Sequence, residues 1–378
     1  MKFTAHGSKS IRCAVMRGGT SRGVFFHADD LPKDQESIDR IMMAVVGAPD
    51  PRQVDGLGGA DLLLSKVAIV RPSKRAGTDI ECRFGSIPPG SKTVKYGANC
   101  GNLSAAVALY AWQENLTSGD EPLRIFNPDS NSAMEARLKS ENFPSSEMSG
   151  MPATGTLVEL TFLDPAGTAS DCLLPTGKAV DFLQLPEGRT IPASIIDSGA
   201  LYVFVRAEDA GLPYAASSKD LQSHADTMNI LEYLRGQAAV LVGLAKSPAE
   251  ARLISGDIPK LAFVSPPSDY RTEGSDLPVS AKHIHLISRI ISNQSFHKAY
   301  AVTGAIATAS AAVVPGSVVY QLIDSERSPI QIGHPTGIMK CAVQWSIADD
   351  EVVISTASVL RTARRIAEGH CFLPDDLL

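Results

Sequence analysis

The chain has 378 residues, of which 44% are hydrophobic and 20% are charged, and its formal net charge is -6. This length is enough for two domains, each with its own core. The acidic balance offers no basic excess to neutralise nucleic-acid phosphates or an anionic membrane surface, so we expect no nucleic-acid and no membrane partner. No apolar run is long enough for a membrane span, and residues 1–10 lack the apolar core of a secretion signal. We therefore expect a cytoplasmic protein.

The first half combines short strands with two different helices. Gln35 to Val46 has apolar residues at helical spacing, which predicts an amphipathic helix. Cys100 to Ala111 predicts a second helix in which nearly every residue is small or apolar. The polar stretch at 139–155 predicts a surface loop or a hairpin insertion. Strands are predicted where short apolar runs are bounded by Gly, Pro, Asp or Ser, at residues 11–16, 23–27, 66–70, 80–84 and 157–162.

The second half repeats this style. Thr303 to Val314 is a helix of the same small, apolar kind as Cys100 to Ala111. More ordinary helices are predicted at 225–244 and 279–291. Strands are predicted at residues 194–196, 201–206, 261–265, 317–322, 339–347 and 351–357.

The two small, apolar helices indicate how the chain is organised. A helix with no polar face must be enclosed on every side. Each half is therefore expected to wrap a sheet around one buried helix, and the pair suggests a duplicated architecture. The polar turn residues at 186–190 (PEGRT) favour a boundary there. We predict two domains, residues 1–187 and 188–378.

Four glycine-rich segments, at residues 16–23, 54–66, 97–102 and 333–337, could form oxyanion cradles. Glycine lets the backbone approach a ligand closely, and the Thr, Ser and Asn between the glycines supply donors. Ordinary turn chemistry is the alternative for any one of them. Nucleotide binding is disfavoured, because GLGGAD is followed neither by a Walker lysine motif nor by an acidic residue at a strand end about twenty positions on.

Two residues are candidates for proton transfer. Cys100 begins its helix, where free N–H groups and the helix dipole favour negative charge. A thiol there is suited to proton transfer or nucleophilic attack, although a small core residue is the simpler alternative. Lys66 lies between DLLLS and the apolar strand VAIV, so it could act as a general base in an apolar cleft. A strand-end lysine that extends to solvent is the alternative.

No metal site is expected from the cysteines and histidines. The cysteines form no CxxC pair, which argues against both a zinc site and a disulfide framework. His283 and His285 are the one close histidine pair, and we favour solvated positions for them over metal ligation.

Taken together, the glycine-rich segments resemble the PrpF family of the diaminopimelate epimerase-like superfold. The family pattern MRGGTS[KR]G, DG-x-GG-x(5)-SK, NCGN and a late GHP[ST]G recurs in order at residues 16–23, 55–66, 99–102 and 333–337. The resemblance implies an α+β fold of two similar domains, each with a curved, mostly antiparallel sheet wrapped around a central helix. It covers essentially the whole chain.

The resemblance also implies an activity. Family members are isomerases of unsaturated di- or tricarboxylates that need no cofactor and move a double bond by allylic proton transfer. Among substrates, the resemblance of the segment VDGLGGADLLLSKVAIV favours 4-oxalomesaconate. The acids 2-methylaconitate, methylitaconate and aconitate are the alternatives. The expected partner is this small polycarboxylate, and a homodimer is left open.

Site residues follow by position. Lys66 resembles the family's catalytic lysine and Cys100 its cleft cysteine, which would act as a second acid or base or would only line the site. The substrate carboxylates and the enolate charge are expected to contact Arg17, Gly19, Thr20, Ser21, Asn99, Gly101, Asn102, His297, Thr303, Gly304, His334, Thr336 and Gly337.

Two other classes of function are alternatives. Relatives are encoded beside an iron–sulfur methylcitrate dehydratase, so an accessory role for such an enzyme is the alternative. An amino-acid racemase or epimerase of the same superfold would use two facing cysteines, but the second small-residue helix opens with VTGA and has none.

Overall fold

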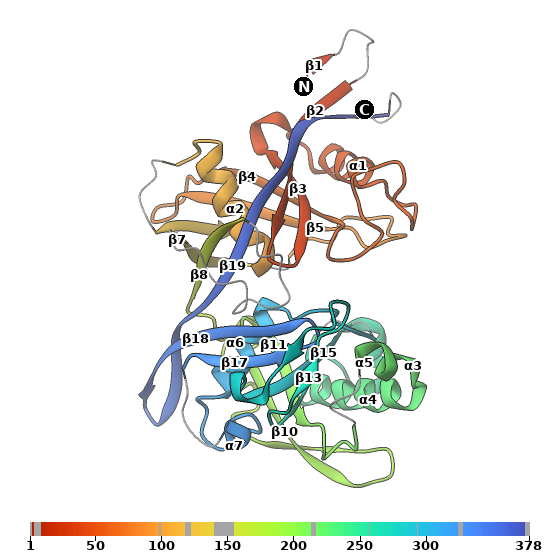
Figure 1. The fold of residues 1–378 in the computed structure, drawn as a ribbon, viewed down its shortest axis with the longest axis vertical. Helices are drawn as coiled ribbons and strands as arrows, with labels where there is room; N and C mark the ends of the chain where they lie inside the picture. The colour runs from red at the N-terminus through yellow and green to blue at the C-terminus, as the bar shows by residue number, and fades with distance from the viewer. Residues whose placement is uncertain are drawn as a thin grey trace. The chain divides into compact units, whose positions relative to one another are not determined.

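The computed structural model describes residues 2–3, 9–97, 100–117, 122–139, 155–212, 217–256, 258–292, 294–323 and 328–374. The predicted surface loop at 139–155 lies almost entirely outside these residues. The described residues form two compact units, one from 2–139, 155–161 and 360–374 and the other from 162–359. Figure 1 shows the chain coloured from red at the N-terminus to blue at the C-terminus.

The first unit wraps a curved sheet around α2 (Gly101–Gln113), while α1 (Gln35–Val46) packs on the other face of the sheet. Every residue of α2 from Gly101 to Ala111 is buried, as its small, apolar composition predicts. The strands are β1 (Lys2–Phe3), β2 (Lys9–Gly18), β3 (Ser21–His27), β4 (Lys66–Pro72), β5 (Ile80–Ser86), β6 (Leu123–Asn127), β7 (Ser132–Lys139) and β8 (Thr156–Leu163), with a single turn η1 (Ala28–Asp30) after β3.

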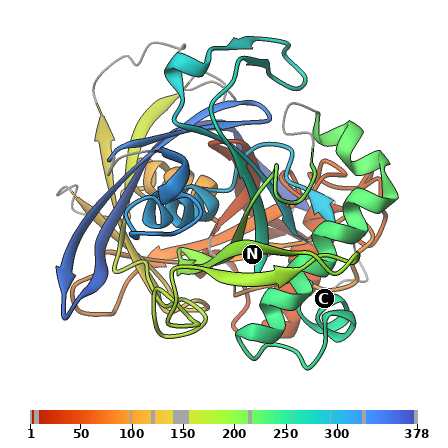
Figure 2. The same cartoon turned by 90° about the horizontal axis from the view of Figure 1, so that it is seen from below.

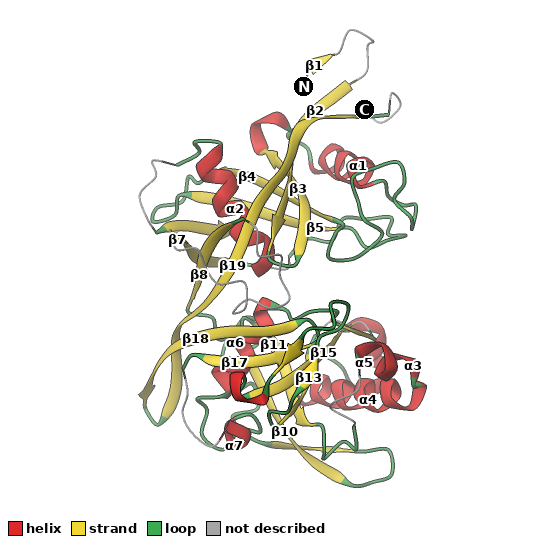
Figure 3. Cartoon of the chain, viewed as in Figure 1, coloured by secondary structure: helices red, strands yellow, loops and turns green. Residues whose placement is uncertain are grey.

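The second unit encloses α6 (Val302–Ala311), which contacts β10, β11 and β18 (Figure 2). The helices α3 (Ser218–Ser223), α4 (Ala225–Leu241) and α5 (Pro248–Ile254) lie together at one side of the unit (Figure 3). The remaining elements are β9 (Asp181–Gln184), β10 (Thr190–Ser198), β11 (Ala200–Arg206), β12 (Lys260–Ser265), β13 (Tyr270–Arg271), β14 (Pro278–Val279), η2 (Ala281–His283), β15 (Leu286–Ser292), β16 (Ser295–Phe296), α7 (Tyr320–Ile323), β17 (Ile330–His334) and β18 (Gly337–Ala348).

The strand pairing confirms the duplicated architecture. From β2 to β7, successive partners are antiparallel, parallel, antiparallel, parallel and antiparallel. The series β10, β11, β12, β15, β17 and β18 gives the same sequence of pairings. In each unit the buried helix follows the fourth strand of the series. The two halves therefore share one topology without an alignable repeat in sequence.

The last strand connects the two units through the chain. β19 (Glu351–Phe372) begins in the second unit, where it pairs with β18. From Leu360 onward it belongs to the first unit, where it pairs antiparallel with β2 and also with β8. The sequence predicts only residues 351–357 of this strand, so its return to the first unit is a new finding.

Two predicted elements are wrong. Residues 279–291 form β14, η2 and β15 instead of a helix. Residues 286–291 are buried throughout, including the polar Ser288 and Arg289, so this strand lacks the alternation of buried and exposed residues that would mark it in the sequence. Residues 317–322 are no strand, because the chain turns there into α7, where the Ser317 side chain accepts a hydrogen bond from the N–H of Tyr320 at 3.0 Å.

Candidate active site

The N-terminus of α2 is the centre of the candidate site. Cys100 is the residue that precedes the helix, and no side-chain hydrogen bond caps this end. Its carbonyl oxygen accepts from the N–H of Ser104 at 2.9 Å, which starts the helix, and its side chain is half-buried. The N–H groups of a first helical turn have no partner inside the helix. This end of α2 therefore favours negative charge beside the thiol.

Lys66 lies directly against this cysteine. Its Nζ donates to Cys100 Sγ at 3.3 Å and lies 3.5 Å from Ser21 Oγ. Lys66 is the first residue of β4, and its backbone is paired with Gly23 of β3 and Ser86 of β5. The lysine therefore starts from the middle of the sheet, and the two residues expected to transfer protons are in contact.

The segment before Lys66 is held by Gln53. The side-chain oxygen of this buried glutamine accepts from Ser65 Oγ at 2.5 Å and from the N–H of Ala60 at 2.9 Å. The carbonyl of Ser65 accepts from the N–H of Ile87 at 3.0 Å. Gly58 lies so close that a Cβ there would come within 2.3 Å of the Gln53 side-chain oxygen. The glycines of this segment therefore form a packed loop that positions Lys66.

The turn between β2 and β3 packs closely against the first turn of α2. A Cβ on Gly18 would lie 2.2 Å from the Asn102 carbonyl oxygen, and a Cβ on Gly19 would lie 2.2 Å from the Asn102 side-chain oxygen. Gly19 also has a φ of +52°, which favours glycine. The two glycines thus allow Thr20 and Ser21 to lie next to the helix start.

Asn102 is buried and joins this turn to the last strand. Its Nδ2 donates to Thr20 Oγ1 at 3.2 Å, and its Oδ1 accepts from Arg361 Nε at 3.1 Å. Arg361 comes from β19, and sequence reasoning did not place it in the site. No local pattern in the sequence predicted this contact, because Arg361 and Asn102 are 259 positions apart in the chain.

Arg17 is also bound to β19. Its Nη1 donates to the Gly19 carbonyl at 3.0 Å and to both the carbonyl and the hydroxyl of Thr362, at 3.0 and 2.9 Å. Burial, and then the neighbouring Arg364, lower the pKa of Arg17. Arg17 therefore connects the turn at Gly19 to β19. Thr362 is a second residue of β19 that the sequence did not predict for the site.

The remaining predicted residue positions of the first unit are Gly101 and Asn99. Gly101 is the buried first residue of α2. Asn99 lies outside the described residues.

In the second unit, two of the predicted site residues belong to α6. Thr303 and Gly304 are in the first turn of this helix, and Thr303 Oγ1 lies 3.2 Å from the hydroxyl of Tyr202. A Cβ on Gly304 would lie 2.4 Å from Ile290 Cδ1, so the helix start is packed closely against β15. Tyr202 is fully buried and was not predicted as a site residue.

The turn at 333–337 is built around His334. Its ring stacks on that of Tyr300 with centroids 5.7 Å apart, and its Nδ1 accepts from the N–H of Thr336 at 3.3 Å. The hydroxyl of Tyr270 lies 2.8 and 2.6 Å from the carbonyl oxygens of His334 and Gly337, which share its single proton. The turn is thus fixed from both sides.

His297 is half-buried just before α6. Its Nδ1 accepts from the N–H of Ala299 at 3.2 Å. The expected contact of His297 with a substrate carboxylate stays a prediction.

Metal ligands do not gather in the part of the chain that the structure describes: no three His, Cys, Asp or Glu residues there could hold an ion together. All six cysteines are free thiols. No described helix is both long enough and apolar enough to cross a membrane.

Two units of one topology, each with a curved sheet around a buried helix, define a diaminopimelate epimerase-like α+β fold. The solved structure of a methylitaconate-delta-isomerase has the same fold, with a TM-score of 0.82 and 33% identity, and the match covers 98% of this chain and 97% of that one. The PrpF protein family model matches residues 8–374. The chain therefore belongs to the PrpF family.

Curated relatives point to the same class of enzyme. A 3-methylitaconate isomerase of Eubacterium barkeri is 35% identical, over 96% of this chain and 97% of that protein. A (4E)-oxalomesaconate Delta-isomerase of Novosphingobium sp. (strain KA1) is 32% identical, over 96% of this chain and 98% of that protein. Relatives and solved structure alike are isomerases of unsaturated carboxylates, and this chain is an isomerase.

Proposed function

We propose that the protein moves a carbon–carbon double bond within an unsaturated di- or tricarboxylate by allylic proton transfer, without a cofactor. The observation that carries this proposal is the 3.3 Å contact of Lys66 Nζ with Cys100 Sγ at the start of α2. The relatives named for methylitaconate and oxalomesaconate support the class of substrate.

The proposed reaction is a proton shift between two carbons. A base removes the proton from the carbon next to the double bond, which leaves a dienolate, and an acid returns a proton to the far carbon. Atoms and charge balance because the substrate gains as many protons as it loses. Lys66 is the proposed base and proton donor. Cys100, which can exchange a proton with Lys66 at contact distance, is the proposed second acid or base.

The dienolate and the substrate carboxylates need donors fixed in advance. The N–H groups at the start of α2 are such donors, because they carry the positive end of the helix dipole. Arg17 and the backbone amides from Gly19 to Ser21 are proposed to add to them. In the second unit, the first turn of α6 and the turn at 333–337 are the proposed carboxylate contacts, with Thr303, Gly304, His297, His334, Thr336 and Gly337 as the contacting residues.

Among the substrates, 4-oxalomesaconate is our first proposal. The sequence from Val54 to Val70 resembles that of family members that act on 4-oxalomesaconate more than that of members that act on 2-methylaconitate. Identities of 35% and 32% to relatives with different printed substrates leave the choice to experiment.

The test is a substrate panel in deuterium oxide. Purified protein is incubated with 4-oxalomesaconate, 2-methylaconitate, methylitaconate and aconitate, and the vinyl and allylic protons are followed by NMR. We expect deuterium incorporation and double-bond migration in one acid far faster than in the others. Absence of exchange in all four, together with a stable complex with a methylcitrate dehydratase, would replace this proposal by the accessory role.

A further inference from the structure

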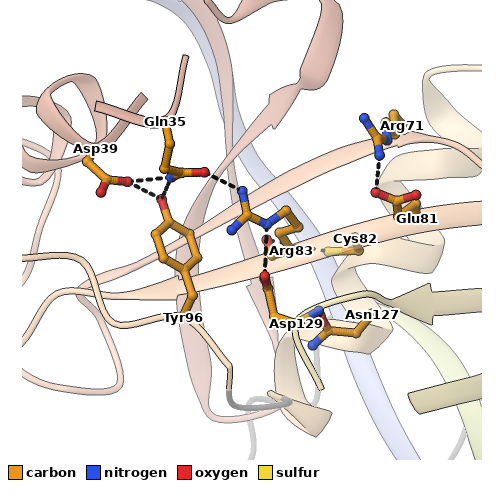
Figure 4. Close-up of polar contacts among 9 residues, drawn as sticks. All are labelled: Gln35, Asp39, Arg71, Glu81, Cys82, Arg83, Tyr96, Asn127 and Asp129. Carbon is orange, nitrogen blue, oxygen red and sulfur yellow. Dashed lines mark hydrogen bonds and ion pairs between the residues drawn. The ribbon is translucent and has the colours of Figure 1, made fainter. Parts of the chain in front are cut away.

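Tyr96 lies at the centre of a hydrogen-bonded network in the first unit, which we call the Tyr96 network (Figure 4). Its hydroxyl donates to Asp39 Oδ1 at 2.7 Å. Gln35 Nε2 donates to the same carboxylate oxygen at 2.6 Å and to the Tyr96 hydroxyl at 3.2 Å. Asp39 and Gln35 both belong to α1, so the hydroxyl of Tyr96 is bound to that helix.

Arg83 of β5 completes the network from the other side (Figure 4). Its Nη1 donates to Gln35 Oε1 at 2.7 Å, and its Nε lies 3.1 and 3.0 Å from the two carboxylate oxygens of Asp129. The guanidinium carbon lies 4.5 Å from the centroid of the Tyr96 ring, which is cation–π distance. The ring and the hydroxyl of Tyr96 are therefore held by different partners.

The hydroxyl of Tyr96 stays a donor. Burial, and then the hydrogen bond to Asp39, raise the pKa of Tyr96, so the phenol remains protonated at neutral pH. A hydrogen bond from a neutral hydroxyl to a carboxylate is among the stronger kinds in proteins.

The same segment of chain is paired with the strand beside Lys66. Lys95 and Ser86 exchange two backbone hydrogen bonds of 2.9 Å, and Ser86 is the antiparallel partner of Lys66. Tyr96 follows directly and precedes Cys100 by four residues. Lys95 and Tyr96 are thus attached to the backbone next to Lys66 and, through the Tyr96 hydroxyl and ring, to α1 and β5.

We propose that Tyr96, held by Asp39 and Arg83, is a positioning residue that keeps Cys100 Sγ in contact with Lys66 Nζ. This inference rests on the proposed function for its link to catalysis. A misplacement of about 1 Å at a reacting group can lower a rate by roughly 100-fold. The substrate contacts that we expect of Asn102 do not depend on Tyr96, because Asn102 is fixed by Thr20 and Arg361.

The first test removes one hydroxyl. Tyr96→Phe retains the ring beneath Arg83 and loses the hydrogen bond to Asp39. We expect kcat to fall about 10-fold with KM changed less than about 2-fold, because positioning is lost and substrate contacts remain. The alkylation rate of Cys100 by iodoacetamide, followed by mass spectrometry, should fall roughly 3-fold as the thiol moves away from the lysine.

A second pair of variants asks whether Asp39 is the acceptor that matters. Asp39→Asn retains an oxygen for the Tyr96 hydroxyl and should keep most of kcat, whereas Asp39→Ala should match Tyr96→Phe. The double variant Tyr96→Phe with Asp39→Ala should be no worse than either single variant, since both remove one interaction.

The matched control is Glu81→Gln. Glu81 lies on β5 and forms an ion pair with Arg71 of β4, which this variant removes (Figure 4). This variant should leave both readouts unchanged. Wild-type kcat and wild-type alkylation in Tyr96→Phe, with only a lower Tm, would overturn the positioning role. If the wild-type protein isomerises none of the four acids, the proposed function fails, and the alkylation rate of Cys100 alone decides the inference.

Discussion

The Nζ atom of Lys66 and the Sγ atom of Cys100 lie 3.3 Å apart, although 34 positions separate the two residues in the chain. The lysine begins a strand and the cysteine precedes a helix, so each is positioned by a rigid element. A group that can accept a proton and a group that can donate one are therefore in contact before any substrate binds.

Lys66→Met should remove the proposed base. Deuterium exchange into the preferred acid should fall at least about 100-fold, which is the contribution typical of general acid–base catalysis. The circular dichroism spectrum and Tm should stay close to wild type. Lys340→Met, at an exposed lysine of β18, is the control and should retain full activity. A fully active Lys66→Met would refute the assignment.

Cys100→Ala distinguishes an acid/base from a residue that only lines the site. If Cys100 carries a proton, kcat should fall roughly 10-fold to 100-fold while KM changes little, because the loss is confined to the transition state. Steady-state kinetics of the NMR-identified reaction measures both constants. A wild-type kcat in this variant would leave Cys100 as a lining residue.

Gly18→Ala should destabilise the first unit. The added Cβ would lie 2.2 Å from the backbone oxygen of Asn102, and the backbone cannot move away as a flexible side chain could. We expect a loss of about 1–3 kcal/mol in the free energy of unfolding, measured in urea. Gly369→Ala is the matched control, because nothing lies within 4 Å of a Cβ at that position. Equal stability of the two variants would contradict the close approach.

Arg361→Met tests the contribution of the last strand to the site. The variant leaves the buried Oδ1 of Asn102 without its arginine donor, which should cost roughly 1–3 kcal/mol of stability. If Asn102 contacts a substrate carboxylate, KM should rise as well. Arg40→Met, at an exposed position of α1, should change neither Tm nor KM. Unchanged stability in Arg361→Met would show that the bond contributes nothing.

Cys13 should make stability fall in alkaline solution. Burial raises the pKa of Cys13 from 9.0 to about 11, with Cys371 as the second cause. Between these two values the unfolded chain releases the thiol proton and the folded chain retains it, so the free energy of unfolding decreases as pH rises. Urea titrations from pH 8 to about pH 11 should show a shallower decrease in Cys13→Ala. An identical slope would contradict the raised pKa.

The sequence indicates the two buried helices well, because a helix of small, apolar residues has only one solution, which is enclosure. It also indicates Lys66 and Cys100 as candidates for proton transfer, because Lys66 lies at the start of an apolar strand and Cys100 begins a helix of small, apolar residues. The strand at Leu286–Ser292 was missed because burial on both faces removes the alternation that marks a strand. Arg361 and the Tyr96 network were missed for another reason: their partners are distant in sequence, and no local pattern reports a tertiary hydrogen bond.

The return of β19 to the first unit affects how the protein can be made. Residues from Leu360 onward supply a strand next to β2 as well as the arginine that binds Asn102. A nascent chain whose residues from Leu360 onward have not yet left the ribosome contains Lys66 and Cys100 but lacks the strand that pairs with β2. The first unit to be translated is therefore the last to be completed, and a truncated chain should not yield a correctly assembled site.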